Sequence, residues 1–239
     1  MTDEPGPDPA EPAAQVVFPL FEMPPVLFED AHCLAVSKPA GLLTQGPAGR
    51  QSLVDLVRAY LRPDDPSAAY LGTVHRLDKP VSGVILWAKT PMAARRLASQ
   101  FEARRVVKEY WAIAEGESKD SFGVWEDWLG PPDPNNIAHV LAEGEPGARR
   151  AITRFERAMG PRPGNGLTRL VLKPETGRSH QLRVQCSSHG LPIMGDVAYG
   201  STRTLPGRIA LHARSLTVEH PILRRPLTIL APAPQYWAG

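Results

Sequence analysis

The chain has 239 residues, of which 42% are hydrophobic and 22% charged, a composition typical of a globular protein with a substantial core. The N-terminus lacks the basic and apolar segments of a secretory signal, and no apolar run approaches the roughly 18 residues of a membrane span. Two cysteines, Cys33 and Cys186, do not make a disulfide framework or a zinc site. These features exclude secreted and membrane proteins, and we expect a cytoplasmic one.

Charge is distributed unevenly along the chain. Residues 1–30 hold seven acids and no Lys or Arg, so the remaining 209 residues carry 27 basic against 18 acidic groups, a net charge of +9. Only six of these bases are lysines, and the planar guanidinium of arginine suits bidentate contact with phosphate. A basic body predicts an anionic partner, most commonly a nucleic acid, although genomic base composition also favours arginine.

The first half of the chain contains clear start and stop signals. Residues 1–24 are acidic and rich in proline, which predicts a disordered tail. The body should begin with two short strands around a turn at residues 30–32. A helix is expected over 51–61, with Ser52 as its N-cap, and a central strand over 83–89. Thr90 and Pro91 then predict the start of another helix.

The second half alternates strands and turns. Residues 106–116 predict a strand that ends at Gly116, and 177–190 predict a helix that ends at Gly190. The remaining expectations are a loop-rich segment at 117–150, a hairpin formed by 151–159 and 167–174, and short strands at 207–213, 215–220 and 226–230. The pattern predicts one α+β domain over residues 25–239, a mixed and largely antiparallel sheet with flanking helices.

An acid between bases stands at the entrance to the predicted central strand, in "GTVHRLDKPVSGVILWAKT". A carboxylate there, Asp78, can act as a base, a nucleophile or a metal ligand, but an isolated aspartate in such a loop more often caps a turn. A second cluster, "KPETGRSHQLRVQ", presents Arg178, His180 and Arg183. A half-buried Arg183 needs an acidic partner, and Asp78 is the candidate. A solvated arginine on a helix face is the alternative.

Tyr110, on the strand predicted over 106–116, is a third candidate. A tyrosine on a strand is usually part of the core, but it can also form a stacking platform for a base. The seven histidines show no metal-binding spacing, and no phosphate-binding glycine loop is present. We therefore expect no metal and no nucleotide cofactor.

Six stretches together resemble the RluA-type family of RNA pseudouridine synthases. In chain order they are "EDAHCLAVSKPAGLLT", "HRLDKPVSGVILWAKT", "KEYWAIAEG", "LKPETGRSHQLRVQ", "GLPIMGDVAYG" and "RIALHARSLTVEHP". They extend over roughly residues 26–232. The resemblance implies the catalytic fold of that family, preceded here by a tail too short for the S4-type RNA-binding domain that many members carry.

The resemblance also implies a reaction and a set of residues. Asp78 corresponds to the catalytic aspartate, Tyr110 to the tyrosine of the family's K-x-Y motif, and Arg183 to the basic partner of the aspartate. The activity would be isomerisation of uridine to pseudouridine in rRNA or tRNA, by a monomer without cofactor or metal. His75, Arg76, Leu77, Arg178 and His180 are then expected to contact RNA or to form the walls of the site. Base flipping would bring the uridine to Asp78.

Departures from the family and alternative functions remain. Gln185 stands where the family commonly has a histidine, and residues 42–49 lack the family's frequent His-Pro; neither position is catalytic in the family, so these differences concern the substrate. One alternative is a catalytically inactive RNA-binding module on the same fold. Another is an aspartate-dependent glycoside hydrolase, which would need a second carboxylate about 5–10 Å from Asp78. Glu109 adjoins Tyr110 and is expected to point to the opposite face of the strand.

Overall fold

Eleven strands and three α-helices make up the part of the chain that the computed structural model describes, residues 21–158, 166–234 and 237. The strands are β1 (Val26–Glu29), β2 (Cys33–Lys38), β3 (Gly72–Thr73), β4 (Ser82–Ala88), β5 (Val107–Glu115), β6 (Phe122–Leu129), β7 (Val140–Leu141), β8 (Arg149–Arg157), β9 (Leu167–Pro174), β10 (Leu211–Glu219) and β11 (Pro226–Leu230). The helices are α1 (Leu53–Leu61), α2 (Pro91–Glu102) and α3 (Gln181–Ser188), with 3₁₀ turns η1 (Pro66–Ala68) and η2 (Val197–Tyr199). The predicted tail falls mostly on residues 1–20, outside the described residues.

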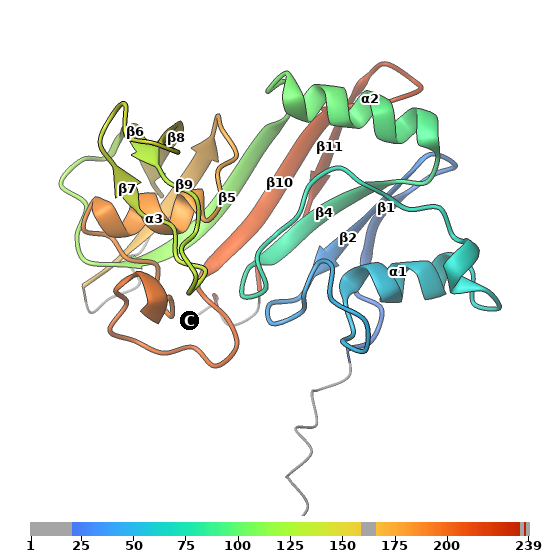
Figure 1. Cartoon of the computed structure of the whole chain (residues 1–239), viewed down its shortest axis with the longest axis horizontal. Coiled ribbons are helices and arrows are strands. Elements are labelled where there is room, and N and C mark those ends of the chain that lie inside the picture. The colour runs from blue at the N-terminus through green and yellow to red at the C-terminus, as the bar shows by residue number, and fades with distance from the viewer. Residues whose placement is uncertain (1–20, 159–165, 235–236, 238–239) are drawn as a thin grey trace, which may run out of the picture.

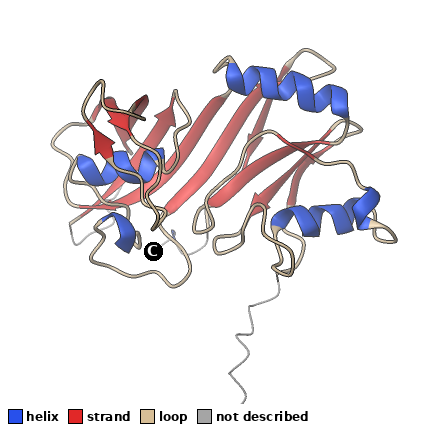
Figure 2. Cartoon of the chain, viewed as in Figure 1, coloured by secondary structure: helices blue, strands red, loops and turns tan. Residues whose placement is uncertain are grey.

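All the strands belong to one sheet in the order β1-β2-β4-β10-β5-β9-β8-β6-β7, with β11 on β10 and β3 on β4 (Figure 1). Every ladder among the described strands is antiparallel except β4–β10, which is parallel. Figure 2 shows this sheet running through the molecule, with helices packed against its faces. The expected α+β class, with a mixed and largely antiparallel sheet, is confirmed.

The predicted central strand is confirmed as β4, in which all seven residues are buried. Gly83 lies at its crossing with β10 and has a φ of +118°. A Cβ at this position would lie 2.2 Å from the carbonyl oxygen of Ala213, so no other residue fits without moving the backbone of one strand. The glycine therefore permits the close parallel pairing that fixes the loop before β4 against the sheet.

The first two helices begin where the sequence predicts. Ser52 donates its N–H to the Asp55 carboxylate at 2.9 Å, and its hydroxyl donates to the same oxygen at 2.7 Å. Thr90 accepts the N–H of Ala93 at 3.3 Å and caps α2. Helix α2 packs on β4 and β10, and its buried face includes Leu97.

Two predictions in the second half need correction and one is incomplete. Residues 117–150 are loop-rich as predicted, but they also contain β6 and β7, and β6 pairs with β8 at eight successive positions. The strand contains Phe, Val and Trp, which favour strands, and the long-range pairing with β8 sets its place in the sheet. The strands predicted at 207–213 and 215–220 are one strand, β10, with an irregular register between Ala213 and Ser215. Helix α3 begins at Gln181, so Arg178 and His180 precede it rather than lying on it.

Two clusters of buried apolar residues lie beneath these elements. The main cluster includes β2, β4 and part of β10, and a smaller one joins β6 and β8 to α3 and η2. No helix in the described ranges is both long and apolar enough to span a bilayer.

Candidate active site

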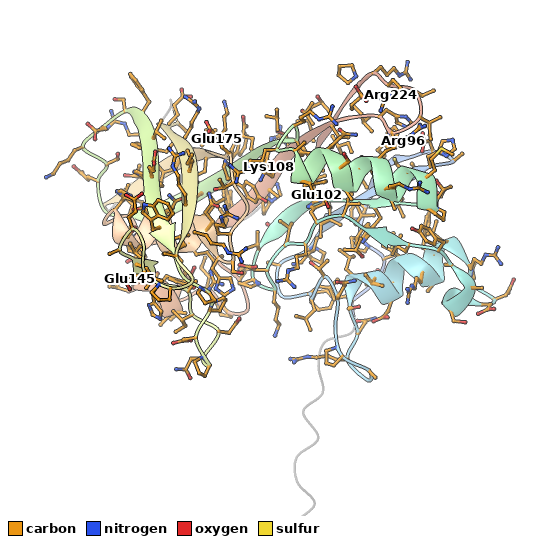
Figure 3. The ribbon with its side chains drawn as sticks, turned by 45° about the horizontal axis from the view of Figure 1, so that its top comes forward. Arg96, Glu102, Lys108, Glu145, Glu175 and Arg224 are labelled. Atoms are coloured by element: carbon orange, nitrogen blue, oxygen red, sulfur yellow. The ribbon has the colours of Figure 1, made fainter. Side chains whose placement is uncertain are left out.

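A cavity of about 820 Å³ contains every residue that the sequence singled out for chemistry or RNA contact. Its walls are the loop 74–81, the end of α2, the start of β5 and the segment 174–183, and Figure 3 shows the labelled Glu102, Lys108 and Glu175 gathered in this region. The residues in question are Asp78, Tyr110, Arg183, His75, Arg76, Leu77, Arg178 and His180. The structure thus brings them together, while their individual roles stay predictions.

The loop that carries Asp78 is held on both sides by hydrogen bonds. The hydroxyl of Thr44 donates to the carbonyl of Leu77 at 2.7 Å and accepts its N–H at 3.2 Å. Beyond Asp78, the carbonyl of Lys79 accepts the N–H of Gly41 at 2.8 Å. The carbonyl of Pro80 accepts the N–H of Ile209, just before β10, at 3.2 Å. The backbone around the carboxylate is therefore fixed before any substrate binds.

Lys38 is buried next to the same loop and holds it through hydrogen bonds to backbone carbonyls. Its ammonium donates to the carbonyl oxygens of Pro39 (3.0 Å), Lys79 (3.1 Å) and Val81 (2.6 Å), and the residue is only 1% exposed. Burial lowers the pKa of Lys38 to about 7, whereas the negative charge of Asp78 acts in the opposite direction. Sequence reasoning missed this residue, although "SKPAG" at the end of a buried strand was its signal.

Arg183 lies between two carboxylates. Its Nε and Nη2 donate to Asp196 at 2.7 and 2.8 Å, and its Nη1 lies 3.4 Å from Oδ2 of Asp78. Burial works against the charge of Arg183, but its hydrogen bonds and attraction to Asp196, aided by Asp78, raise its pKa. The predicted pairing of Asp78 with Arg183 is thus present as the longer of two contacts, and Asp196 is the partner that sequence reasoning overlooked.

The two carboxylates differ sharply in exposure. The side chain of Asp196 is 2% exposed, whereas that of Asp78 is 32% exposed and faces the cavity. Arg183 therefore has one permanent, bidentate partner in the interior and one accessible partner at the cavity surface. A group that enters the cavity can reach Asp78 without disturbing the buried pair.

His180 and Tyr199 complete the surroundings of the arginine. The Tyr199 hydroxyl accepts the N–H of Ala138 at 2.9 Å and shares a hydrogen bond with Nδ1 of His180 at 2.7 Å, in which either atom can be the donor. Nε2 of His180 lies 3.7 Å from Oδ2 of Asp78. Burial lowers the pKa of His180, although Asp78 opposes this shift. The Tyr199 ring also stacks beneath Arg183, with the guanidinium carbon 4.6 Å from the ring centroid.

The turn before α3 is fixed by Gln181. Its side-chain oxygen accepts the Thr176 hydroxyl at 2.7 Å and the N–H of Arg178 at 3.0 Å. Its amide nitrogen donates to Thr153 at 2.9 Å. The positive φ of His180, 53°, turns the chain from this segment into the helix. Gln181 thus places two predicted RNA-contacting residues at the cavity.

Tyr110 projects from β5 into the cavity and packs against the main core. Its backbone is fixed between β9 and β10, where it pairs with Leu172 and Ala213. Burial, and then the negative charge of Asp78, raise the pKa of the Tyr110 hydroxyl. The side chain is therefore neutral at physiological pH, with an aromatic face beside the carboxylate.

His75 has a structural role that the sequence left open. Its Nε2 accepts the N–H of Leu86 at 2.9 Å, and its ring stacks on Phe101 with centroids 5.0 Å apart. Burial lowers the pKa of His75 to about 4, so the ring is neutral and its Nε2 is occupied. Arg76 next to it is exposed and lines the cavity, where it is available to a ligand.

Gln185, at which the chain departs from the family pattern, does not line the cavity. It is fully buried, accepts the Thr153 hydroxyl at 2.6 Å and donates to Asp127 at 2.7 Å. The same carboxylate lies 3.1 Å from His189, whose ring stacks on Trp125. The residue thus joins α3 to β6 and β8 in the interior.

Two other features of the described residues lie away from this chemistry. A larger cavity of about 970 Å³ borders the opposite side of the Asp78 loop, but none of the eight predicted residues lines it. Ligand atoms of Asp30, Cys33 and His220 lie within 4.8 Å of one another. His220 already donates from Nε2 to Asp30 at 2.7 Å and accepts two backbone N–H groups at Nδ1, so hydrogen bonding accounts for this cluster.

Comparison with known proteins gives a consistent result. Residues 32–188 match the family model of RNA pseudouridylate synthase. The chain is 37% identical over 215 residues to the dual-specificity RNA pseudouridine synthase RluA of Escherichia coli K12, covering 87% of this chain and 92% of that protein. It is 35% identical over 217 residues to ribosomal large subunit pseudouridine synthase C of Vibrio vulnificus, covering 87% of this chain and 65% of that protein.

A solved structure extends the likeness to the fold. Human RNA pseudouridylate synthase domain containing 1 superposes with a TM-score of 0.72 at 28% identity, covering 87% of this chain and 83% of that one. Asp78, Tyr110 and Arg183, which line the cavity described above, all fall within the matched range of residues 32–188.

Proposed function

This chain belongs to the RluA-type family of RNA pseudouridine synthases, and from that membership we propose that it isomerises specific uridines of rRNA or tRNA with Asp78 as the nucleophile. It is an isomerase acting on RNA; the target and the role of the aspartate are our proposal. The observation that carries the proposal is the Asp78 carboxylate, which is accessible from the cavity and lies 3.4 Å from the Arg183 guanidinium.

The reaction is balanced without an external reagent. The bond between ribose C1′ and N1 of uracil breaks, the detached ring turns, and C1′ bonds to C5. The hydrogen on C5 is lost and N1 gains one, so the product has the composition of the substrate. What the protein must supply is stabilisation of the electron-poor sugar, retention of the free ring and removal of one proton.

Asp78 suits the first requirement. An ionised carboxylate can attack the sugar carbon or stabilise its positive character, as carboxylates do in glycoside chemistry. The Arg183 guanidinium lies 3.4 Å from this carboxylate. The 32% exposure of the Asp78 side chain leaves its oxygen open to the cavity while the backbone around it is pinned by Thr44 and Lys38.

Tyr110 and the apolar wall suit the second requirement. The neutral phenol ring provides a face on which uracil can stack, and Leu77, next to the proposed nucleophile in the chain, also lines the cavity. A stacked ring can rotate in its plane without leaving the site. The raised pKa of Tyr110 means that its hydroxyl would assist proton removal as a hydrogen-bonding group and not as a preformed phenolate.

Entry of the uridine requires base flipping. A base in folded RNA must leave its stack at a cost of a few kcal/mol, which protein contacts must offset. Arg76 is exposed at the cavity next to Asp78 and can contact the displaced strand or occupy the vacated space. His75, by contrast, would act by holding the loop through Leu86.

The test is pseudouridine mapping by carbodiimide labelling and reverse transcription, in total RNA from cells with and without the gene. We expect one or a few sites to vanish on deletion and to return with wild type but not with Asp78→Asn, which keeps the shape of the side chain. Purified Asp78→Asn should still bind RNA. If no site changes, the function assigned here is wrong and an RNA-binding module without activity becomes the better reading.

A further inference from the structure

Three cations border the cavity without forming an ion pair. Arg104 follows the end of α2, Lys108 lies near the start of β5, and Arg178 lies in the turn before α3; we call these three the cation cluster. Within the described part of the chain, none of the three takes part in a salt bridge. Three elements distant in sequence thus bring positive charge to one wall.

The members of the cluster repel one another. Burial, and then the charge of Arg104, lower the pKa of Lys108. Burial lowers the pKa of Arg178 as well, followed by the charges of Arg104 and Arg149. Like charges gathered around half-buried groups destabilise a fold unless an anion binds there, and such an arrangement is typical of a functional site.

The acids of the same wall do not neutralise the cluster. Glu175 is held by Arg154, whose Nε donates to it at 2.6 Å. Glu102 is exposed at the last residue of α2. Figure 3 shows Glu102, Lys108 and Glu175 in one region, and the structure gives Lys108 an ion pair with neither acid. The positive charge therefore faces the cavity uncompensated.

Space for an anion lies beside Lys108. The ammonium has three donors, and in the described residues it makes one hydrogen bond, to the carbonyl of Thr176 at 3.2 Å. A Cβ placed on Gly177 would meet this ammonium at 4.0 Å and, apart from its chain neighbours, nothing closer. The ammonium therefore lies at contact distance from the Gly177 turn, and its two remaining donors border the cavity that Arg104 and Arg178 also line.

We propose that the cation cluster binds backbone phosphates of the RNA strand that carries the target uridine. The cluster would hold that strand against the wall formed by α2, β5 and the turn before α3 while the base enters beside Asp78. This inference rests on the proposed function, since it assumes that the ligand of the cavity is RNA. It adds Arg104 and Lys108 to Arg178, which was already predicted to contact RNA.

The test measures salt dependence of RNA binding by the purified full chain. Fluorescein-labelled dodecauridylate serves as the probe, and its anisotropy is followed between 50 and 200 mM KCl. Each phosphate contact contributes about 0.7 to the slope of log affinity against log salt for a single strand. We compare wild type with Arg104→Gln, Lys108→Gln and Arg178→Gln, singly and combined.

The matched control is Arg224→Gln. Arg224 is paired with Glu219 at 2.8 Å in the turn between β10 and β11, and Figure 3 shows it well apart from Lys108. Each cluster variant should lower the slope by about 0.7, so that the loss of affinity between 50 and 200 mM KCl becomes about 2.6-fold smaller per variant. The control removes the same charge and should keep the wild-type slope.

Several results would overturn the inference. They are an unchanged slope in the cluster variants, an equal loss of slope in the control, or no binding of dodecauridylate by wild type at 50 mM KCl. Equal binding of a dodeca-aspartate peptide through the same residues would assign the cluster to an acidic protein. If the triple variant does not fold, the three single variants decide the matter.

The readout does not depend on catalysis. If the cluster variants have a lower salt slope but wild type forms no pseudouridine, phosphate binding by the cation cluster is supported and the proposed function is rejected. If wild type forms pseudouridine but the variants keep the wild-type slope, the proposed function is supported and phosphate binding by the cluster is rejected. The two proposals can therefore fail separately.

Discussion

Replacing Asp196 with asparagine should test the geometry of the site more directly than removing Asp78. The substitution keeps the shape of the side chain and removes the charge opposite Nε and Nη2 of Arg183, at 2.7 and 2.8 Å. Removing one partner of a buried ion pair costs about 3–5 kcal/mol. An asparagine oxygen can still accept one of the two bonds, and Asp78 remains, so we expect a loss of about 3 kcal/mol.

For a chain of this length, 1 kcal/mol corresponds to about 2–4 °C in Tm, so Asp196→Asn should melt about 6–12 °C below wild type. Arg183 would lose the carboxylate that holds its Nε and Nη2 in place. A misplacement of about 1 Å in a catalytic group can cost about 100-fold in rate. We therefore expect kcat to fall by about 10–100-fold at a temperature where the variant is folded, with RNA affinity little changed. Single-turnover pseudouridine formation and thermal unfolding measure the two effects.

Asp127→Asn is the matched control for Asp196→Asn. Asp127 is also a largely buried carboxylate of the same half of the molecule, but it contacts Gln185 and His189 and does not line the cavity. It should lower Tm without lowering kcat of the folded protein. A wild-type kcat in Asp196→Asn, together with a lowered Tm, would refute the idea that Asp196 positions Arg183, and an unchanged Tm would refute the buried pair itself.

Three further variants test other parts of the structure. Thr44→Val removes both hydrogen bonds to the backbone of Leu77. It should lower the free energy of unfolding, measured in urea, by about 1–3 kcal/mol and should also lower kcat. Full activity would show that these bonds do not position the loop. Burial lowers the pKa of His212 to about 4, so the unfolded chain binds the extra proton between about pH 4 and 6.5, and stability rises with pH over that window. His212→Gln should make this rise smaller in urea unfolding across the same pH range, and an unchanged rise would contradict the prediction. Tyr110→Phe should bind RNA like wild type, and Tyr110→Ala about 5–150-fold more weakly if the ring stacks on a base; equal binding by both would exclude stacking.

The sequence predicted the elements whose signals are local. The Thr90–Pro91 helix start and the apolar run of β4 need no partner to be recognised, because capping and continuous hydrophobicity are properties of neighbouring residues. Strand β6 could not be predicted in the same way. Its Phe, Val and Trp residues favour a strand, but a glycine and two acids interrupt them, and its pairing with β8 joins residues 20 to 34 positions apart.

The same limit applied to the site. Asp78, Tyr110 and Arg183 were found through motifs, and the structure places them in one cavity. Asp196 lies in a matched stretch, "GDVAYG", but an aspartate after a glycine suggests a turn unless its distance to Arg183 is known. Lys38 had a signal in its place at the end of a buried strand, but its three acceptors are backbone carbonyls that only the fold brings within reach.

The two carboxylates around Arg183 have a bearing on the proposed mechanism. If Asp78 becomes an ester of the ribose, it loses its charge, and a buried arginine with no other partner would be left uncompensated at the most reactive stage. Such a charge costs several kcal/mol and would oppose the formation of the intermediate. Asp196 is 2% exposed and keeps its two hydrogen bonds to Arg183 whatever Asp78 does.

The distances fit this division. Arg183 is bound tightly to Asp196, which the proposed reaction does not use, and more loosely, at 3.4 Å, to Asp78, the proposed nucleophile. Asp78 can therefore leave its contact at little cost, while the arginine stays charged, fixed and compensated. A site in which Arg183 paired with Asp78 alone would hold its nucleophile more firmly and, for that reason, release it to the sugar less readily.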